Sequence, residues 1–297
     1  MGVTDDARIV FTLAILLSIV FPWYSRPLSD YIIPLLIASM SVSLRGLKLD
    51  LSMGRQAWVP VIRALSLHFI AQNAVILAAS WYLIRDPDFL AGMIILASVP
   101  PAVSCVPFTF LLKGDAKTST ITEILSYVLS LIITPLMILW FIGGHMDVAY
   151  LVRLLLLLIL LPLLASRILG RINTGLWVHS KSFVTLCFGL ITYIIIGLNH
   201  QIIRSQATAL LPILAVVIIK TFVLGSLVFF HYLGREGYGR AVSYTLFSSY
   251  KNNGAAAVIA LSILPVKASL PFAFASFAEI AFFILLKQLS RNRFPGS

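Results

Sequence analysis

The chain is 297 residues long, and 60% of its residues are hydrophobic while only 11% are charged. A soluble domain typically has about 25% charged residues, so this composition excludes an ordinary soluble protein. Cations outnumber anions and give a formal net charge of +11. Because the basic residues lie between apolar segments, membrane topology explains them better than a nucleic-acid partner does.

The apolar segments divide the chain into membrane crossings. About 20 apolar residues span a bilayer as a helix, and by this criterion the chain has ten crossings joined by short loops. We therefore predict an all-α membrane protein that forms one integral domain over residues 1–297. The predicted crossings are 8–23, 30–46, 58–84, 89–112, 117–143, 148–168, 181–203, 207–233, 238–263 and 268–289.

The positions of the cations predict the orientation. Loops on the cytoplasmic side carry an excess of Lys and Arg, and here one set of loops and ends holds fourteen cations against five in the other. This bias predicts a multi-pass protein of the cytoplasmic (inner) membrane with both termini in the cytoplasm. The fourteen are Arg8, Arg45, Lys48, Arg55, Lys113, Lys117, Arg167, Arg171, Lys181, Arg235, Arg240, Lys287, Arg291 and Arg293; the five are Arg26, Arg85, Arg153, Arg204 and Lys267.

Ten crossings divide into two halves of five, residues 1–146 and 147–297. Because five is odd, the second half starts from the opposite side of the membrane, which predicts an inverted repeat. The two halves share little residue-level identity, so the repeat is inferred from topology.

The fourth crossing of each half is interrupted. The polar run from Ser248 to Gly254 divides the crossing 238–263, and the run from Val99 to Pro107 places three prolines in the crossing 89–112. Lipid offers no hydrogen bonds to backbone, so a broken helix must be buried in protein or line a cavity. One such break alone is equally compatible with a simple proline kink. Two breaks at corresponding positions are typical of secondary transporters.

Few ionisable side chains lie inside the crossings. Lys251 sits in the second interruption, and the only carboxylates away from the ends of the crossings are Glu123 and Glu279. We expect Glu279 to form a structural ion pair with Lys220. Glu123 shares a helix face with Ser119, and its partner is either Lys251 or a bound ion, unless it lies close enough to the cytoplasmic end to be solvated.

His68 is the only histidine well inside an apolar crossing. It is either a proton carrier in the polar site or a structural hydrogen-bonding group. An intramembrane enzyme with Glu123 and His68 as acid and base is a remote alternative, because no nucleophile motif accompanies them. A channel would need a continuous polar lining, whereas the polar residues here gather at the interruptions. The chain has no nucleotide-binding loop, so transport would depend on an ion gradient.

Several short motifs resemble one family in their order and spacing. They are Ile33-Pro34-Leu35-Leu36, the run from Phe110 to Asp115, Thr134-Pro135-Leu136 and Asn253-Gly254-Ala255. On these motifs, essentially the whole chain resembles the bile acid:sodium symporters. The resemblance implies two inverted five-helix repeats whose discontinuous fourth and ninth helices cross at the midplane. It also implies a substrate cavity between a panel of helices and a core.

The chain departs from this family at its sodium ligands. Where the family reads Pro-Gly-Gly-Thr-Ser-Ser-Asn, this chain has a run from Pro100 to Val106, in which Ser104 and Cys105 precede a Val in place of the Asn. The family's ninth-helix Glu falls on Ser248. One amide and one carboxylate are therefore missing.

Other family positions are changed or retained. The Gln-Asn pair of the ninth helix falls on Asn252 and Asn253, and the third-helix Gln falls on His68. A fifth-helix Thr near the sodium site falls on Glu123, whereas Ser119 is retained.

These changes lead to a hypothesis about the coupling ion. Sodium prefers several oxygen ligands, and if Lys251 reaches Glu123 its ammonium takes the position of the sodium charge. We therefore expect at least one sodium site to be replaced by a Lys–Glu pair, in a carrier that is proton-coupled or ion-independent. The alternative is a conventional sodium symporter with Glu123, Ser119 and Asn252 as sodium ligands.

We expect no enzymatic activity and no cofactor apart from sodium ions or protons. The expected partners are the lipid bilayer and a small organic anion. The resemblance points to bile-acid-like amphipaths, 2-keto acids or pantoate-like carboxylates. The predicted substrate- and ion-binding residues are Lys251, Asn252, Asn253, Glu123, Ser119, Ser104, Cys105, His68 and Ser248.

Overall fold

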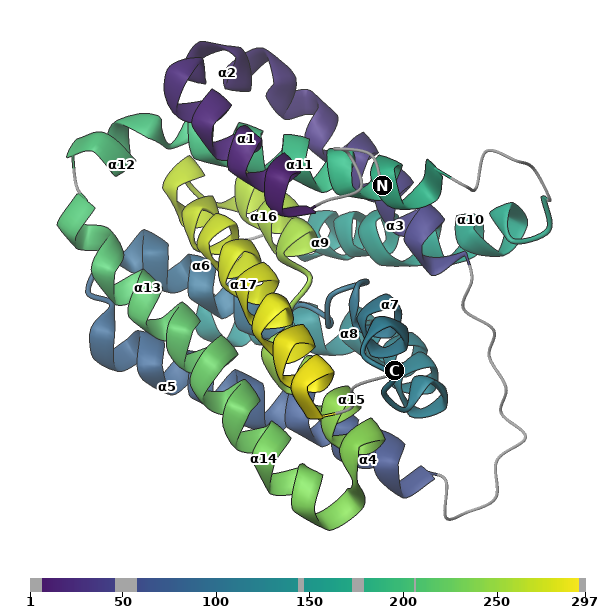
Figure 1. Cartoon of the computed structure of the whole chain (residues 1–297). Coiled ribbons are helices and arrows are strands. Elements are labelled where there is room, and N and C mark those ends of the chain that lie inside the picture. Colours follow the sequence, from purple (N-terminus) through teal and green to yellow (C-terminus); the bar gives the residue numbers. More distant parts are fainter. Residues whose placement is uncertain (1–6, 46–57, 144–146, 173–178, 206, 294–297) are drawn as a thin grey trace.

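A computed structural model describes residues 7–45, 58–143, 147–172, 179–205 and 207–293. Throughout these ranges the regular structure is helical, with no strand (Figure 1). The all-α prediction is therefore confirmed. Two of the predicted cytoplasmic cations, Lys48 and Arg55, lie outside the described residues.

Within the described ranges, seven helices are long and apolar enough to cross a membrane. They coincide with seven of the predicted crossings, so the chain is a multi-pass membrane protein. The other three predicted crossings, 8–23, 89–112 and 238–263, contain shorter helices. The seven are Pro22–Leu44, Trp58–Leu83, Ala116–Phe141, Ala149–Leu169, Ser180–Leu198, Ala207–Glu236 and Val266–Ser290.

The helices form two groups, each packed mainly within itself, and Figure 1 shows the first group above the second. We call the first group the panel and the second the core. The panel contains α1 (Ala7–Val20), α2 (Ser25–Leu28), α3 (Ile32–Leu44), α9 (Val148–Leu155), α10 (Leu161–Leu169), α11 (Ser180–Leu198) and α12 (His200–Ser205). The core contains α4 (Trp58–Ser66), α5 (Asn73–Leu83), α6 (Pro87–Ser98), α7 (Cys105–Leu111), α8 (Ala116–Phe141), α13 (Leu211–Ile218), α14 (Leu224–Glu236), α15 (Tyr238–Ser249), α16 (Asn253–Ile263) and α17 (Leu270–Arg293).

Short 3-10 helices flank several of these elements: η2 (Pro22–Tyr24), η3 (Ser29–Tyr31), η8 (Ala207–Leu210) and η10 (Val266–Ser269). Three long helices instead contain a π-helical turn, a feature that often occurs near functional sites. These turns are η5 (Leu67–Gln72) between α4 and α5, η6 (Leu156–Leu160) between α9 and α10, and η9 (Ile219–Val223) between α13 and α14. Two of them carry buried polar residues of the core, His68 on η5 and Lys220 on η9.

The start of α6 is fixed by local chemistry. Asp86 caps the helix by accepting from the backbone N–H groups of Asp88 and Phe89 at 3.0 and 3.3 Å. Lys267, next to α17, donates to the other carboxylate oxygen of Asp86 at 2.9 Å. Partial burial acts to raise the pKa of Asp86, but the Lys267 ammonium and these amide bonds together hold it below its ordinary value of 3.8.

Helices α14 and α15 pack tightly against each other and are joined at Gly237. The φ angle of this residue is +82°, a conformation that L side chains rarely adopt. Glycine therefore permits the abrupt reversal that brings α15 back into the core.

Small residues let the panel approach the core at the start of α16. Ala255, Ala256 and Ala257 are almost completely buried, as expected where membrane helices pack closely. A Cβ added at Gly254 would meet side-chain atoms of Leu36 on α3 and Phe188 on α11. The panel thus touches the core beside the second helix break.

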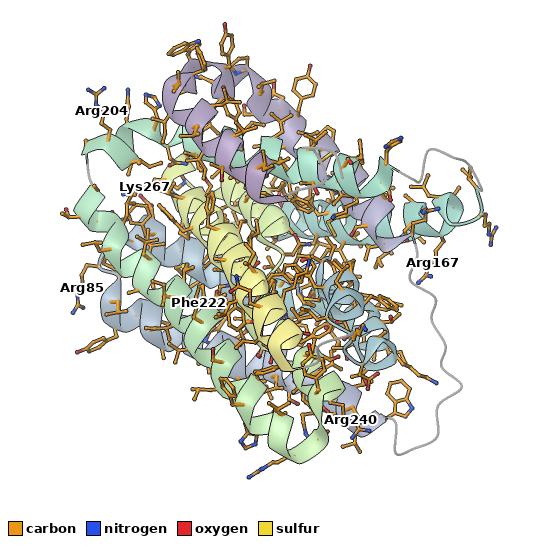
Figure 2. The ribbon with its side chains drawn as sticks, viewed as in Figure 1. Arg85, Arg167, Arg204, Phe222, Arg240 and Lys267 are labelled. Atoms are coloured by element: carbon orange, nitrogen blue, oxygen red, sulfur yellow. The ribbon has the colours of Figure 1, made fainter. Side chains whose placement is uncertain are left out.

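The cations labelled in Figure 2 from the two predicted sets lie at opposite ends of the molecule. Figure 2 shows Arg85, Arg204 and Lys267 at one end of the helices, and Arg167 and Arg240 at the other. This arrangement agrees with the predicted separation of the loops into two sides. Which side faces the cytoplasm is a prediction from the cation bias.

Candidate functional site

Two broken helices meet inside the core. The first break lies between α6 and α7, and the second between α15 and α16. At the first break Val99 is extended, with φ −73° and ψ 157°, because the ring of Pro100 disfavours helix in the residue before it. The backbone N–H of Asn252 donates to the carbonyl of Pro100 at 2.9 Å, so the two breaks are in direct contact.

Asn252 also joins the breaks through its side chain. Its Oδ1 accepts from the backbone N–H of Ala255 at 3.0 Å and caps α16. Its Nδ2 donates to the hydroxyl of Tyr127 at 2.9 Å and lies 3.6 Å from Sδ of Met40, while the Tyr127 hydroxyl donates to the carbonyl of Pro101 at 3.2 Å. Both polar atoms of the Asn252 side chain therefore already have partners within the protein.

Lys251 occupies the second break, and its ammonium turns toward the end of α6. Nζ donates to Oδ1 of Asn73 at 2.7 Å and to the carbonyls of Ala97 and Val99 at 2.8 and 3.2 Å. The side chain is completely buried. The free carbonyls at a helix C-terminus carry partial negative charge, so the end of α6 is a natural partner for a cation.

His68 also belongs to this cluster, and its role as a proton carrier stays a prediction. Its Nε2 lies 3.3 Å from Nζ of Lys251, and its Nδ1 lies 3.1 Å from the carbonyl of Phe247. An ammonium donates hydrogen bonds and cannot accept them. This favours the tautomer of His68 in which Nδ1–H donates to the carbonyl of Phe247 and Nε2 accepts from Lys251. His68 thus connects α15 to the Lys251 cluster.

The predicted Lys251–Glu123 ion pair is wrong for this conformation. Glu123 lies on α8 and is completely buried, and neither carboxyl oxygen has a hydrogen-bond partner among the described residues. The ammonium of Lys251 is satisfied instead by backbone carbonyls and the Asn73 amide. The carbonyl acceptors come from the backbone geometry of the break, which residue types do not reveal.

The predicted pair of Lys220 and Glu279 does form, and it holds the second break together. Oε1 of Glu279 accepts from Nζ of Lys220 and from the backbone N–H of Lys251 at 3.1 Å. Oε2 accepts from Nδ2 of Asn253 at 2.8 Å. Lys220 also donates to the carbonyl of Ser249, the last residue of α15, at 3.0 Å. One carboxylate therefore connects Lys220 on η9, the backbone of Lys251 in the break and Asn253 at the start of α16.

Ser119 belongs to a chain of hydroxyl groups that connects three helices. Thr109 on α7 donates to Ser119 on α8 at 2.9 Å, and Ser119 donates to Ser243 on α15 at 2.9 Å. Ser243 in turn contacts the carbonyl of Asp115 at 3.0 Å. The hydroxyl of Ser119 is thus committed to helix packing, and no hydrogen bond joins it to the carboxyl of Glu123.

The side chains of two other predicted residues bond only to backbone carbonyls. The thiol of Cys105 donates to the carbonyl of Leu246 at 3.7 Å, and the hydroxyl of Ser248 donates to the carbonyl of Thr245 at 3.0 Å. Both side chains are completely buried. They stabilise the ends of α7 and α15 rather than facing open space.

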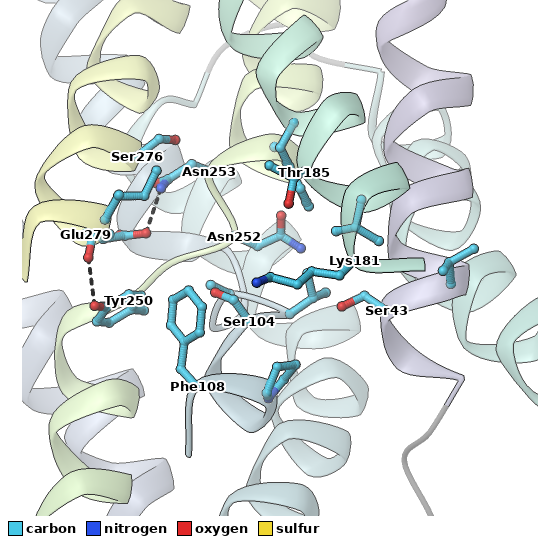
Figure 3. A pocket seen from close by; sticks show the side chains of 18 of the residues that line it. Ser43, Ser104, Phe108, Lys181, Thr185, Tyr250, Asn252, Asn253, Ser276 and Glu279 are labelled. Atoms are coloured by element: carbon cyan, nitrogen blue, oxygen red, sulfur yellow. Dashed lines mark hydrogen bonds between the residues drawn. The ribbon is translucent and has the colours of Figure 1, made fainter. Parts of the chain in front are cut away.

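A cavity of about 590 Å³ lies beside the two breaks, between the panel and the core (Figure 3). This volume is in the range of small-molecule sites. Of the nine predicted site residues, Ser104, Lys251, Asn252 and Asn253 line it, whereas the other five lie in the surrounding core. The break is therefore the part of the predicted site that faces a ligand-sized space.

Several lining residues were not predicted as site residues. Lys181 on α11 and Arg45 at the end of α3 face the cavity from the panel, although the sequence suggested only that they mark the cytoplasmic side. Phe108 and Tyr250 face it from the core, with ring centroids 5.9 Å apart. No local pattern in the sequence distinguishes these residues from interfacial cations and packed aromatics, because they come from segments far apart in the chain.

Comparisons with known proteins identify the family of this chain. No curated protein matches the chain. The model of the SBF-like CPA transporter family matches residues 7–235, a stretch that includes the first break and the whole panel and ends before the second break. The match covers well over half of the chain and confirms the resemblance to bile acid:sodium symporters. The chain belongs to the SBF-like CPA transporter family.

Proposed function

We propose that this protein is a secondary active transporter that moves a small organic anion by alternating access. The observation that carries the proposal is the cavity at the meeting point of two broken helices, between two separately packed helix groups. Broken helices at such a position supply free backbone ends for ligands. We further propose that residues 1–146 and 147–297 are inverted repeats and that the two groups move against each other.

We propose that the Lys251 ammonium permanently occupies one cation position. Its neighbours, Oδ1 of Asn73 and the carbonyls of Ala97 and Val99, are hard oxygen ligands of the kind that sodium takes in proteins. A fixed ammonium bonded to these oxygens leaves no room for a sodium ion. At least one sodium site of the family is, on this proposal, absent.

Glu123 is the group we propose for proton coupling. Its carboxyl is buried and has no hydrogen-bond partner in the described part of the chain. An ionised carboxylate in that environment would be costly, so the neutral acid is favoured. The titratable groups within electrostatic range of Glu123 include Cys105 and Tyr127. A rearrangement that exposed Glu123 to water would allow it to release its proton. The same unpartnered carboxyl also supports the alternative, a sodium site at Glu123.

The coupling is tested with purified protein in liposomes that contain a pH-sensitive dye. We expect addition of a transported carboxylate to cause proton movement without sodium, and we expect Glu123→Gln to abolish that movement while the protein stays folded. A saturable thermal stabilisation by sodium over choline that is lost in Glu123→Gln would instead support the sodium symporter.

The role of Lys251 is tested by creating the vacant site. In Lys251→Ala the three oxygen ligands lose their cation, so we expect sodium to stabilise this variant against heat more than choline does, because a ligand that binds only the folded state raises its apparent stability. The matched control is Lys287→Ala, which removes an exposed cation of α17. If sodium stabilises neither variant, the oxygens around Lys251 are not a latent cation site.

A further inference from the structure

We propose that Lys181 on α11 binds the anionic group of the substrate, an apolar monocarboxylate of the kind that the family resemblance implies. This inference rests on the proposed transport function and names the residue that holds the anion in its cavity. It departs from the expectation that Lys251, Asn252 and Asn253 hold the carboxylate.

Each side-chain nitrogen at the second break already donates a hydrogen bond within the protein. The ammonium of Lys251 is buried and bonded to groups on α5 and at the end of α6. The Nδ2 of Asn252 faces Tyr127, and that of Asn253 donates to Glu279 at 2.8 Å. A carboxylate accepts and cannot donate, so the contact with Glu279 also fixes the orientation of the Asn253 amide. The polar atom that Asn253 has left is Oδ1, an acceptor.

Lys181, unlike the buried Lys251, has an exposed side chain that faces the cavity. It lies in the first turn of α11. Figure 3 shows its side chain extending from the panel helix into the cavity, with the ammonium toward Ser104 and Asn252. No acceptor among the described residues forms a hydrogen bond or ion pair with this ammonium. It is a cation available to an anion in the cavity.

The rest of the cavity suits an apolar body. Phe108 faces the cavity and is held by stacking on Phe283, with ring centroids 4.0 Å apart. Val184 and Phe188 line it from α11. The one carboxylate in the lining, Glu279, is already paired with Lys220 and therefore repels a bound anion little. Arg45, the other cation in the lining, already has an interaction within the protein, whereas Lys181 has none among the described residues. A single charge on an apolar ligand is therefore the chemistry that this set of groups matches.

The position of Lys181 also couples binding to movement. The cation belongs to the panel, whereas Phe108 and Tyr250 belong to the core. A monocarboxylate held by Lys181 and packed on Phe108 spans the two groups. Its binding energy therefore depends on how they are placed relative to each other, as alternating access requires.

The test compares acids with their neutral amides. Binding of hexanoate, phenylacetate and cholate, each beside its amide, is measured calorimetrically with the full-length protein in detergent. We expect Lys181→Gln to weaken binding of the best acid about ten- to hundredfold, the range of a lost charge-assisted contact, and to leave the amide unchanged. Lys181→Arg should retain acid binding within a few-fold, and the matched control Lys287→Gln should behave as wild type.

The outcomes separate this inference from the proposed function. If acids bind and are transported but Lys181→Gln binds them as wild type does, Lys181 is only an interfacial cation. The inference about Lys181 is then wrong, while the proposed transport function stands. Equal binding of acids and amides by wild type would also overturn it. If none of the acids binds to the wild-type protein, the ligand class is wrong; if in addition no carboxylate drives proton movement in liposomes, the transport proposal falls as well.

Discussion

A single buried carboxylate, Glu279, holds the second helix break in place. It neutralises Lys220 and accepts from the backbone of Lys251 and from the amide of Asn253. A buried ion pair gains little over a well-packed apolar pair, but removal of one partner leaves an uncompensated charge. The value of Glu279 therefore lies in the geometry that it imposes on the break.

A double-mutant cycle tests this role. We expect Lys220→Met alone and Glu279→Gln alone each to destabilise the protein by about 3–5 kcal/mol, because each leaves a buried charge unpaired. The double variant should be less destabilised than the sum of the two, since the unpaired charge is gone. Denaturant unfolding in detergent micelles measures all four proteins. Strict additivity would show that the two side chains do not act as a pair.

Residue identity revealed which ionisable groups are buried, but not which partners they take. Lys220 and Glu279 pair as expected, because each is a charge that needs an opposite charge. Lys251 takes carbonyl groups instead of Glu123. Every residue has a carbonyl, and only the broken helix makes those of Ala97 and Val99 available.

At the scale of the elements, the breaks were predictable and their contacts were not. Paired prolines end α6 because Pro100 disfavours helix at Val99 and lacks an N–H of its own. Pro107 lies beyond the break, in the first turn of α7, where a missing N–H has no cost because the first N–H groups of a helix have no intrahelical partner. The bond from Asn252 to Pro100 depends on how α15 and α16 pack on α6, which no local pattern encodes.

The packing of α6 on η10 leads to a prediction. A Cβ at Gly92 would be too close to the backbone oxygen of Ala268, and backbone cannot easily move aside. We expect Gly92→Ala to lower stability by about 1–3 kcal/mol, as overpacking does.

The matched control is Gly234→Ala, on α14, where nothing lies within 4 Å of the added atom. This change should be neutral or stabilise by about 0.4–1 kcal/mol, because alanine restricts the unfolded chain. Thermal unfolding in detergent compares the two variants. Equal stability of both would mean that α6 and η10 are not in close contact in the membrane protein.

At the scale of the whole molecule, two helix groups enclose a cavity. The panel combines segments from both halves of the chain, as does the core. The cavity is lined from both groups, so a ligand there contacts parts that are far apart in sequence. This is why Lys181, which looks like one more cation of a loop, lies opposite the helix breaks.

The cation bias leads to a prediction for the orientation in the membrane. We expect reporter fusions after Asp115 and at the C-terminus to be cytoplasmic, and a fusion after Asp86 to lie on the opposite side, because the more basic loops remain inside. Paired alkaline phosphatase and green fluorescent protein fusions at each site measure this. Phosphatase activity at the C-terminus would reverse the predicted orientation.

The sequence by itself determined the all-helical membrane class, the family and the positions of the two breaks. These follow from apolar segment length, from proline and glycine chemistry and from local motifs, all of which act over a few neighbouring residues. The tertiary structure decided the partners of Lys251, the isolation of Glu123 and the placement of Lys181 in the cavity. Those depend on backbone groups and on contacts between distant helices, which are set only when the two groups pack.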